Sequence, residues 1–460
     1  MKGSNTELVQ RIAKLLKQNN ELIKKNKQLS DQNDELTQIK ERYERLLEKL
    51  SIDKSDEVKA AAQTETIRYK VATVLYAGIH GSARITDKYD EPGLMDDIDK
   101  VFYYLEEIIA KYKIIRTKSV GDTYIAVGGI ANKNSTNPIQ VILAALEMKQ
   151  MLARLSSDKV PWDIRFGIHS GNITAVISGK KKKNYDLKGD TLNIASRMEG
   201  WSDTGKINIS AMTYELVKEF FNCEYYGKMP VRYKGNLQMY TVKGIKTELS
   251  EGGEGIIPNQ AFKTKFALAQ FSDLQEIMLD KLEKGLPEHL FYHNVKHTVD
   301  VVTQVELIGW GESIGDEEIL ILKTAALFHD AGHVISYDEH EYHGTVMAQE
   351  MLPEYGYSPS QINQICELIM ATKMPPNPKN RLEEIMCDSD LDYLGRSDMV
   401  PVSSNLYKEL KKQNKIDTFN DWNKLQIKFL SNHQYFTSTA RNLREVNKLK
   451  QIDRIKKLIV

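Results

Sequence analysis

The chain has 460 residues, of which 41% are hydrophobic and 27% are charged, and its formal net charge at pH 7 is zero. This length accommodates two or three domains, and the neutral charge gives no electrostatic reason to expect nucleic acid or an acidic membrane as a partner. The three cysteines have no paired spacing, and we find neither an apolar run of membrane-spanning length nor a signal-peptide core. We therefore expect a cytoplasmic protein with reduced thiols.

Residues 1–60 carry a heptad pattern that continues from Leu8 to Leu50. One core position of the heptad is mostly leucine, and the alternating position includes three successive asparagines. Leucine at the d position with polar residues at the a position is typical of a parallel two-stranded coiled coil, in which buried asparagines select the register. We expect this segment to form a parallel homodimer that brings two copies of the next domain side by side.

The central part of the chain, residues 65–246, alternates strand-like and helical patterns. A strand-like run at 69–77 precedes a helical pattern at 95–113, and two short strands, 114–119 and 123–127, then form a predicted hairpin. The further predicted elements are a helix at 138–156, a strand at 164–177, a helix from 189, a strand at 206–210, a helix at 212–221 and strands to 245. This order predicts an α+β sandwich of the ferredoxin-like kind.

Residues 184–200 concentrate polar side chains and become helical in spacing from Gly189. Asn193 and Arg197, four residues apart, are expected to project side by side. An amide and a permanently charged guanidinium in that arrangement can bind one anion. By itself the stretch fits an amphipathic helix with solvated polar residues better, so its interpretation depends on the motifs around it.

Four separated motifs together resemble the class III adenylate/guanylate cyclase catalytic domain: KSVGD (118–122), FGIHSGN (166–172), YDLKGDTLNIASRMEG (185–200) and YKGNLQMYTVKG (233–244). The resemblance implies an active site shared between two subunits and Mg²⁺ or Mn²⁺ as cofactor. It implies nucleotide binding by Lys118, Asp186 and Lys234, catalysis by Asn193 and Arg197, and metal binding by Asp122. A lysine donor beside an aspartate acceptor suits the edge of adenine.

The sequence departs from this family at the end of the first strand, where Gly78 occupies the position of a second metal-binding aspartate. Two carboxylates normally hold the divalent ions that activate the ribose hydroxyl and neutralise the triphosphate, so the loss removes a charge and a ligand. This departure favours an impaired or purely nucleotide-sensing domain. The alternative is an active cyclase with unusual metal ligation.

A glycine-rich, acidic stretch predicts a linker at 247–261, and beyond it residues 262–460 are helical in pattern almost throughout. Histidines and aspartates gather there in four motifs, which are HNVKHTVDV (293–301), FHDAGH (328–333), EHEYH (339–343) and DSDLDYLG (388–395). Any one of these histidines fits an ordinary core or surface position, but together they supply nitrogen and oxygen ligands for a divalent cation. His293 and His297 are four residues apart and are expected to share a helix face.

The combined pattern resembles the HD-domain metal phosphohydrolases, which implies an all-α HD domain. The implied metal ligands are His297, His329, Asp330 and Asp390, with Asp388 as the rival for the last place. The first motif is also similar to an element of cyclic nucleotide phosphodiesterases, which implies that His293 protonates the leaving oxygen. A second metal or the phosphate is assigned to His333, His340 or His343. The resemblance leaves Mn, Fe, Zn or Mg open as the metal.

These features predict a multidomain, homodimeric signalling protein with adenine nucleotide or cyclic nucleotide as its small-molecule partner. The leading hypothesis combines a metal-dependent HD phosphohydrolase, with cyclic nucleotide as a candidate substrate, and a cyclase-like domain that binds nucleotide. One alternative is a bifunctional enzyme that makes cyclic AMP from ATP and also hydrolyses it. The other is a non-enzymatic, dimeric nucleotide-sensing scaffold.

Overall fold

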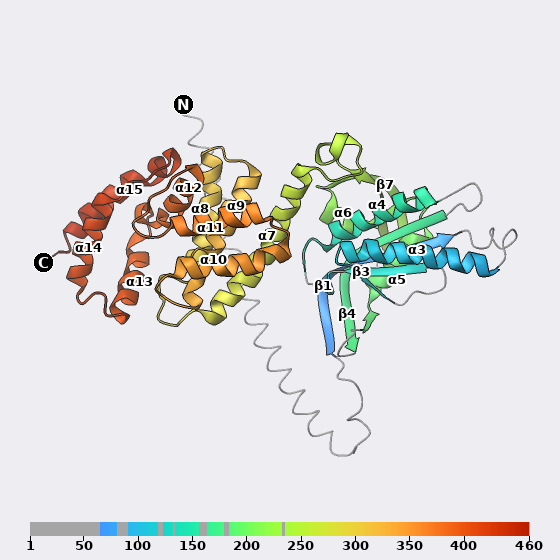
Figure 1. Cartoon of the computed structure of the whole chain (residues 1–460), viewed down its shortest axis with the longest axis horizontal. Helices are drawn as coiled ribbons and strands as arrows, with labels where there is room; N and C mark the ends of the chain where they lie inside the picture. The colour runs from blue at the N-terminus through green and yellow to red at the C-terminus, as the bar shows by residue number, and fades with distance from the viewer. Residues whose placement is uncertain are drawn as a thin grey trace, which may run out of the picture. The chain divides into compact units, whose positions relative to one another are not determined.

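The computed structural model describes residues 65–80, 91–117, 123–131, 134–155, 163–178, 184–231 and 235–459. The predicted coiled coil of residues 1–60 lies outside these ranges, as do Lys118, Asp122 and Lys234. The described residues form an α/β part and an all-helical part (Figure 1).

The α/β part begins with a long strand and alternates strands with helices, as predicted. Its elements are β1 (Glu65–His80), α3 (Glu91–Lys111), β2 (Ile115–Arg116), β3 (Thr123–Gly128), α4 (Asn137–Leu155), β4 (Asp163–Ser178), β5 (Asn184–Lys188), α5 (Asp190–Gly200), β6 (Ile207–Ser210), α6 (Ala211–Val217), β7 (Phe221–Val231) and β8 (Gly235–Ile245). The prediction missed β5, although Tyr185 and Leu187 alternate with the exposed Asp186 and Lys188 over this short strand. It also continued α6 to Phe221, where β7 already begins.

The strands form one mixed sheet in the order β2-β3-β1-β4-β6-β8-β7, with β5 paired to β4. Strand β1 is antiparallel to β3, whereas β4 and β6 run parallel. The predicted hairpin is confirmed in its pairing, because β2 lies antiparallel to β3. The ferredoxin-like description of this sheet remains a prediction.

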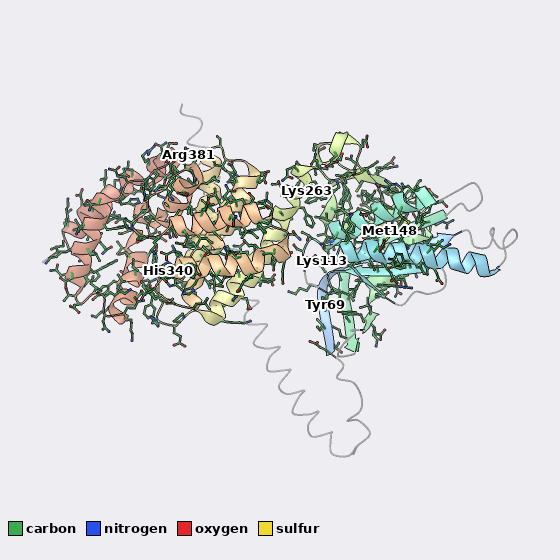
Figure 2. The ribbon with its side chains drawn as sticks, in the orientation of Figure 1. Tyr69, Lys113, Met148, Lys263, His340 and Arg381 are labelled. Atoms are coloured by element: carbon green, nitrogen blue, oxygen red, sulfur yellow. The ribbon has the colours of Figure 1, made fainter. Side chains whose placement is uncertain are left out.

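Helix α4 supplies much of the apolar surface that covers the sheet. Its side chains at helical spacing, Ile142, Ala145, Met148 and Leu152, are all buried, and Met148 can be found in Figure 2. They belong to one core with Phe166 of β4, which is itself fully buried. Such an apolar stripe is what fixes an amphipathic helix on a sheet face.

A glycine brings α5 close to the sheet. A Cβ atom at Gly167 of β4 would lie 2.0 Å from the backbone nitrogen of Glu199, so only glycine allows this approach. Helix α5 therefore sits directly on the sheet, and its outer face carries Asn193 and Arg197, both exposed. The predicted helical start is also correct, because the helix begins at Asp190.

The predicted linker contains two short 3-10 helices, η2 (Thr247–Leu249) and η3 (Glu251–Gly253). Ser250 and Pro258 form an isolated β-bridge across it, and the backbone nitrogen of Ile245 donates to the carbonyl of Gly255 at 2.8 Å. The stretch is thus organised by its own backbone hydrogen bonds. Its role as a hinge remains a prediction.

The remaining described residues form only helices and turns, as predicted. These helices are α7 (Gln260–Gly285), α8 (Val295–Gly311), α9 (Asp316–Phe328), η4 (Ala331–Val334), α10 (His340–Met351), η5 (Leu352–Tyr355), α11 (Pro359–Ala371), α12 (Arg381–Asp390), η6 (Asp392–Gly395), α13 (Met399–Lys412), α14 (Phe419–Asn432) and α15 (Ser438–Lys456). In the described part of the chain, no helix is both long enough and apolar enough to cross a membrane.

Helix α9 is the central helix of this bundle. Nine of its residues, among them Leu322 and Phe328, are buried, and together they lie on every face of the helix. The helix packs against α7, α8 and α11. A helix that is apolar all round belongs in the interior. Its C-terminal end therefore delivers the next two residues, His329 and Asp330, into the core.

Candidate metal centre and nucleotide site

The four predicted HD metal ligands meet at one place in the helical bundle. His297 lies in the first turn of α8, His329 and Asp330 follow α9, and Asp390 is the last residue of α12. The two histidines and Asp330 are at least nine-tenths buried. Helix ends from three different parts of the sequence thus converge on one buried cluster.

The facing atoms of this cluster are close enough to share one cation. His297 Nε2 lies 3.1 Å from Asp390 Oδ1 and 3.3 Å from His329 Nε2. Asp330 Oδ2 lies 3.2 Å from His329 Nε2 and has no hydrogen-bond donor among the described residues. A buried carboxylate oxygen without a donor is expensive unless a cation compensates it, and nitrogen and oxygen atoms are the ligands that divalent cations use.

The tautomer of His329 is set by its surroundings. Its Nδ1–H donates to the carbonyl of Ala326 at 2.8 Å, because a carbonyl oxygen can only accept. With Nδ1 engaged there, Nε2 is the nitrogen that faces Asp330 and Asp390. A hydrogen bond that fixes the far nitrogen in this way is the usual second contact of a metal-binding histidine.

A second group adjoins the first and shares Asp330 with it. The ligand atoms of His293, Asp330 and His333 lie within 4.8 Å of one another. His340 Nε2 is 3.6 Å from Asp330 Oδ1, its Nδ1–H donates to the carbonyl of Tyr337 at 3.1 Å, and its ring stacks on His333. His343 lies one turn further along α10, and neither group of described residues includes it.

The electrostatics keep this cluster anionic. Burial acts to raise the pKa of Asp390, but the imidazoles of His297 and His329 outweigh it, so the pKa lies well below its ordinary value. The pKa of Asp330 is likewise held far below normal, because the same kind of imidazole contacts overcome burial. Burial lowers the pKa of His333 to about 3, which leaves its ring neutral. Ionised carboxylates beside imidazole nitrogens can bind a cation, and the same carboxylates raise the pKa of His329 well above its ordinary value although burial acts to lower it.

His293 does not share a helix face with His297, contrary to our expectation. The side chain of Asn294 accepts hydrogen bonds from the backbone nitrogens of Lys296 and His297, so it caps α8 and places His293 before the helix. The two imidazoles nevertheless remain neighbours, with ring centroids 6.1 Å apart.

Glu409 of α13 holds His293 in place, and sequence reasoning missed it. Its side chain is fully buried and accepts from Nδ1–H of His293 at 2.5 Å and from the backbone nitrogens of Tyr292 and His293. Burial acts to lower the pKa of His293, but the Glu409 carboxylate and the cluster carboxylates raise it above its ordinary value. The glutamate lies 116 residues away in an amphipathic helix, where no local signal marks it.

The structure also separates Asp388 from Asp390. Asp388 accepts from the backbone nitrogens of Phe436 and Thr437 and from the Thr437 hydroxyl, at 2.7–3.0 Å. It therefore binds the start of α15, and its oxygens are occupied there. Asp390, two residues later, takes the place in the cluster.

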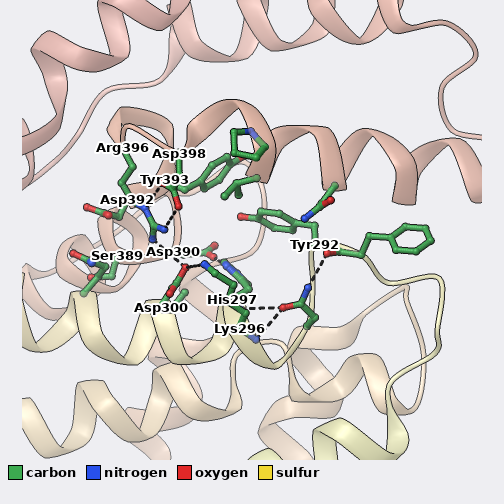
Figure 3. A pocket seen from close by; sticks show the side chains of 17 residues that line it. Tyr292, Lys296, His297, Asp300, Ser389, Asp390, Asp392, Tyr393, Arg396 and Asp398 are labelled. Atoms are coloured by element: carbon green, nitrogen blue, oxygen red, sulfur yellow. Dashed lines mark hydrogen bonds and ion pairs between the residues drawn. The ribbon is translucent and has the colours of Figure 1, made fainter. Parts of the chain in front are cut away.

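Two cavities open beside the cluster. The first, of 220 Å³, is lined by His297 and Asp390 together with paired charges, in which Arg396 donates to Asp398 and Asp300 (Figure 3). The second, which we call the apolar cavity, measures 300 Å³ and adjoins His293, Asp330, His340 and Asp390. Its other walls include Met399, Leu406 and Leu410 of α13 and Trp422, Leu425 and Phe429 of α14. Tyr292 and Tyr393 line both cavities.

Only part of the predicted cyclase-type site falls within the described residues. Asn193 and Arg197 are exposed on α5, and the Arg197 guanidinium reaches the carbonyl of Pro230 at 3.4 Å. The Asp186 side chain on β5 is 72% exposed, so it is open to a ligand. Gly78 lies in β1 directly opposite Thr123 of β3, the residue that follows Asp122 in sequence.

Comparison with known proteins identifies both parts of the chain. Residues 64–244 match the family model of the adenylate and guanylate cyclase catalytic domain, and residues 294–394 match that of the HD domain. The chain therefore contains a class III cyclase catalytic domain and an HD domain.

Individual relatives align with a limited share of the chain. The germination-specific adenylate cyclase of Dictyostelium discoideum is 32% identical over 181 residues, which are 38% of this chain and 21% of that protein. The receptor-type guanylate cyclase gcy-13 of Caenorhabditis elegans is 27% identical over 201 residues, or 42% of this chain and 20% of that protein. The chain thus spans about a fifth of the length of these curated relatives.

Among solved structures, the guanylate cyclase domain of RhGC from Catenaria anguillulae in complex with GTP is 28% identical. The match covers 39% of this chain and 100% of that one, with a TM-score of 0.37. The similar proteins include both adenylate and guanylate cyclases.

Proposed function

We propose that this chain is a cyclic-nucleotide signalling protein whose HD domain is a metal-dependent phosphohydrolase. The observation that carries the proposal is the buried convergence of His297, His329, Asp330 and Asp390 beside an apolar cavity. Asp330 Oδ2 makes no hydrogen bond among the described residues, which suits an oxygen that faces a bound cation. A cyclic nucleotide is the candidate substrate.

The residues present fit a divalent cation. His297, His329, Asp330 and Asp390 would hold one ion, and His293, His333 and His340 surround Asp330 on the side where a second would bind. When bound, such a cation supplies positive charge that polarises the phosphate and eases removal of a proton from the attacking water. The metal remains Mn, Fe, Zn or Mg in this proposal.

His293 is the proposed proton donor to the leaving oxygen. The Nδ1–H bond to Glu409 directs Nε2 away from that glutamate and toward the side of Asp330. Hydrolysis joins the oxygen of water to phosphorus and breaks the phosphorus–oxygen bond to the alcohol. The proton that the alcohol oxygen needs comes from His293 in this scheme.

The test of this proposal is a product analysis with the full-length protein. Protein loaded with Mn²⁺ is incubated with cyclic AMP, cyclic GMP and a panel of nucleoside monophosphates and polyphosphates, and products are separated by chromatography. We expect hydrolysis of at least one phosphate ester, which a chelator abolishes and added metal restores. If no substrate in the panel is hydrolysed when the protein is loaded with Mn, Fe, Zn or Mg, the result would favour the nucleotide-sensing scaffold.

Replacing Glu409 by glutamine is expected to lower kcat by roughly 10- to 100-fold while KM and bound metal change little. The amide keeps the size of the side chain but loses the charge that positions His293. The measurement is steady-state kinetics together with metal analysis and a melting curve. Lys412→Gln, on the exposed side of the same helix, serves as the control. A loss of metal in step with activity would instead assign Glu409 a structural role.

The cyclase-like domain is proposed to bind adenine nucleotide. Lys118 and Asp186 would contact the base, Lys234 the polyphosphate, and Asn193 and Arg197 the ribose and phosphates. The exposure of Asp186, Asn193 and Arg197 supports this assignment. Asp122 would hold a single Mg²⁺ or Mn²⁺, since Gly78 offers no second carboxylate.

The same exposed residues favour a bifunctional cyclase and phosphodiesterase as the second candidate function. Both candidates use the predicted coiled coil of residues 1–60 to form a parallel homodimer. They also share the proposed boundaries of a ferredoxin-like cyclase domain at 65–246, a linker at 247–261 and an HD domain at 262–460.

A further inference from the structure

The apolar cavity differs in chemistry from the first cavity, although both open onto the metal centre. In the first, Arg396 pairs with Asp398 and Asp300, and Lys296 pairs with Asp300 at 2.7 Å (Figure 3). An apolar group placed there would strip water from charged pairs, which costs free energy. In the apolar cavity the same group would cover leucine, methionine and aromatic side chains, which is favourable.

Two polar side chains of the apolar cavity wall, Gln426 and Thr372, are already hydrogen-bonded, whereas the Trp422 indole N–H has no acceptor among the described residues. The Ser403 hydroxyl donates to Gln426 Oε1 at 2.5 Å, and the Gln426 amide donates to Asn423 at 3.5 Å. The Thr372 hydroxyl donates to the carbonyl of Ile369 at 2.8 Å. A ligand group that enters the cavity therefore meets mainly apolar surface, and the Trp422 indole N–H is a donor that it could use.

The cavity also continues away from the metal centre. Met374, Leu425 and Phe429 line both it and an outer groove of 510 Å³, whose remaining wall runs from Lys428 to Phe436. Leu425 is 47% exposed, so it borders solvent at this junction. The apolar surface thus extends beyond the immediate neighbourhood of the phosphate.

We propose that the apolar cavity selects phosphate esters whose organic part presents a large apolar surface. This inference rests on the proposed hydrolase function and names the substrate class of the same site. Esters of nucleosides and esters of alkyl alcohols share this chemistry, because a nucleobase face and an alkyl chain are both apolar. Sugar phosphates and other esters with small polar groups would be poor substrates. Most pockets for small molecules combine apolar walls with few polar contacts in this way.

Two matched substrate pairs test the proposal on full-length, Mn²⁺-loaded protein. The first compares cyclic AMP with methyl ribofuranoside 3′,5′-cyclic phosphate, which has the same ester and no base. The second compares octyl with methyl p-nitrophenyl phosphate, which release the same leaving group. We expect kcat/KM to favour the apolar member of at least one pair by roughly 10- to 100-fold. A preference in the first pair identifies the nucleobase as the group that the cavity recognises, and a preference in the second pair identifies an alkyl chain.

Leu425→Glu introduces a charge at the solvent border of the cavity, and we expect it to reduce that preference at least about tenfold. Leu443→Glu on α15, a leucine of similar exposure outside the cavity wall, is the control and should change nothing. Leu406→Trp fills the cavity from α13 and should have the same effect as Leu425→Glu. Ratios near one in both pairs, or ratios that neither cavity variant alters, would overturn the proposal.

Complete absence of turnover would contradict the proposed hydrolase function and leave the cavity to be tested by binding. Calorimetric titration of metal-loaded protein with cyclic AMP and with the abasic cyclic phosphate then gives the comparison. Tighter binding of cyclic AMP, weakened by Leu425→Glu, would support apolar selection. Equal or undetectable binding of the two ligands would overturn it.

Discussion

Replacing Asp330 with alanine is expected to remove the bound metal and to lower phosphate ester hydrolysis by at least about 10³-fold. Asp330 is the residue that the two metal-ligand groups share, with Oδ2 at 3.2 Å from His329 and Oδ1 at 3.6 Å from His340. Its removal takes one negative charge from a set whose other members, apart from Asp390, are imidazoles. Metal content by mass spectrometry and turnover of the preferred substrate measure the two effects.

The matched control for this variant is Asp338→Ala. Asp338 lies in the same region of the sequence, but its side chain is 89% exposed and its ion pair with Lys415 spans 3.8 Å. An exposed pair of this kind contributes little to stability, so the control should keep both metal and activity. Hydrolysis that persists at the wild-type rate in Asp330→Ala would refute the assignment of the metal centre.

Restoring a carboxylate by Gly78→Asp is expected to raise cyclic AMP formation from ATP by at least about 10²-fold over a low wild-type level. Gly78 pairs with Thr123 across two neighbouring strands, so the new side chain would stand beside the segment that contains Asp122. A second carboxylate would complete the pair that the cyclase family uses for its metal ions. The assay is cyclic AMP production with Mg²⁺ or Mn²⁺.

The double variant Gly78→Asp with Arg197→Ala checks that any gain comes from this site. Arg197 lies exposed on α5, away from the HD domain in sequence, and its loss should cancel the gain. If Gly78→Asp produces no cyclic AMP, further parts of the site have changed beyond position 78. Robust cyclic AMP formation by the unmodified protein would establish the bifunctional enzyme instead.

The helices and strands were predictable because their signals are local. The apolar stripe of α4 and the continuous apolar run of α9 identify a surface helix and a central helix from spacing alone. Strand β5, which pairs with β4, carried a short alternation of Tyr185 and Leu187 with polar residues that the prediction overlooked. His293 was expected on a helix face with His297, but helix α8 begins at Val295, because Asn294 caps it and excludes His293.

The metal ligands could be predicted from short motifs, because clusters of histidine and aspartate are uncommon in apolar helical segments. The sequence by itself thus determined the residue types available for a cation and the absence of a carboxylate at Gly78. The folded chain decided how they are used. The sequence assigned Asp390 to the cluster with Asp388 as its rival, and the structure shows that Asp388 binds the start of α15 and Asp390 joins the cluster.

Glu409 and the apolar cavity were decided only by the tertiary structure. Glu409 contacts His293 from a position 116 residues later in the sequence. The cavity walls come from helices whose apolar faces predict that they pack in the core but do not predict a cavity. Spacing along a helix reports which side chains share a face, but it carries no information on which distant face will lie opposite. The partner of His293 and the shape beside the metal centre therefore depend on how α13 and α14 pack, and that arrangement is set by the whole core.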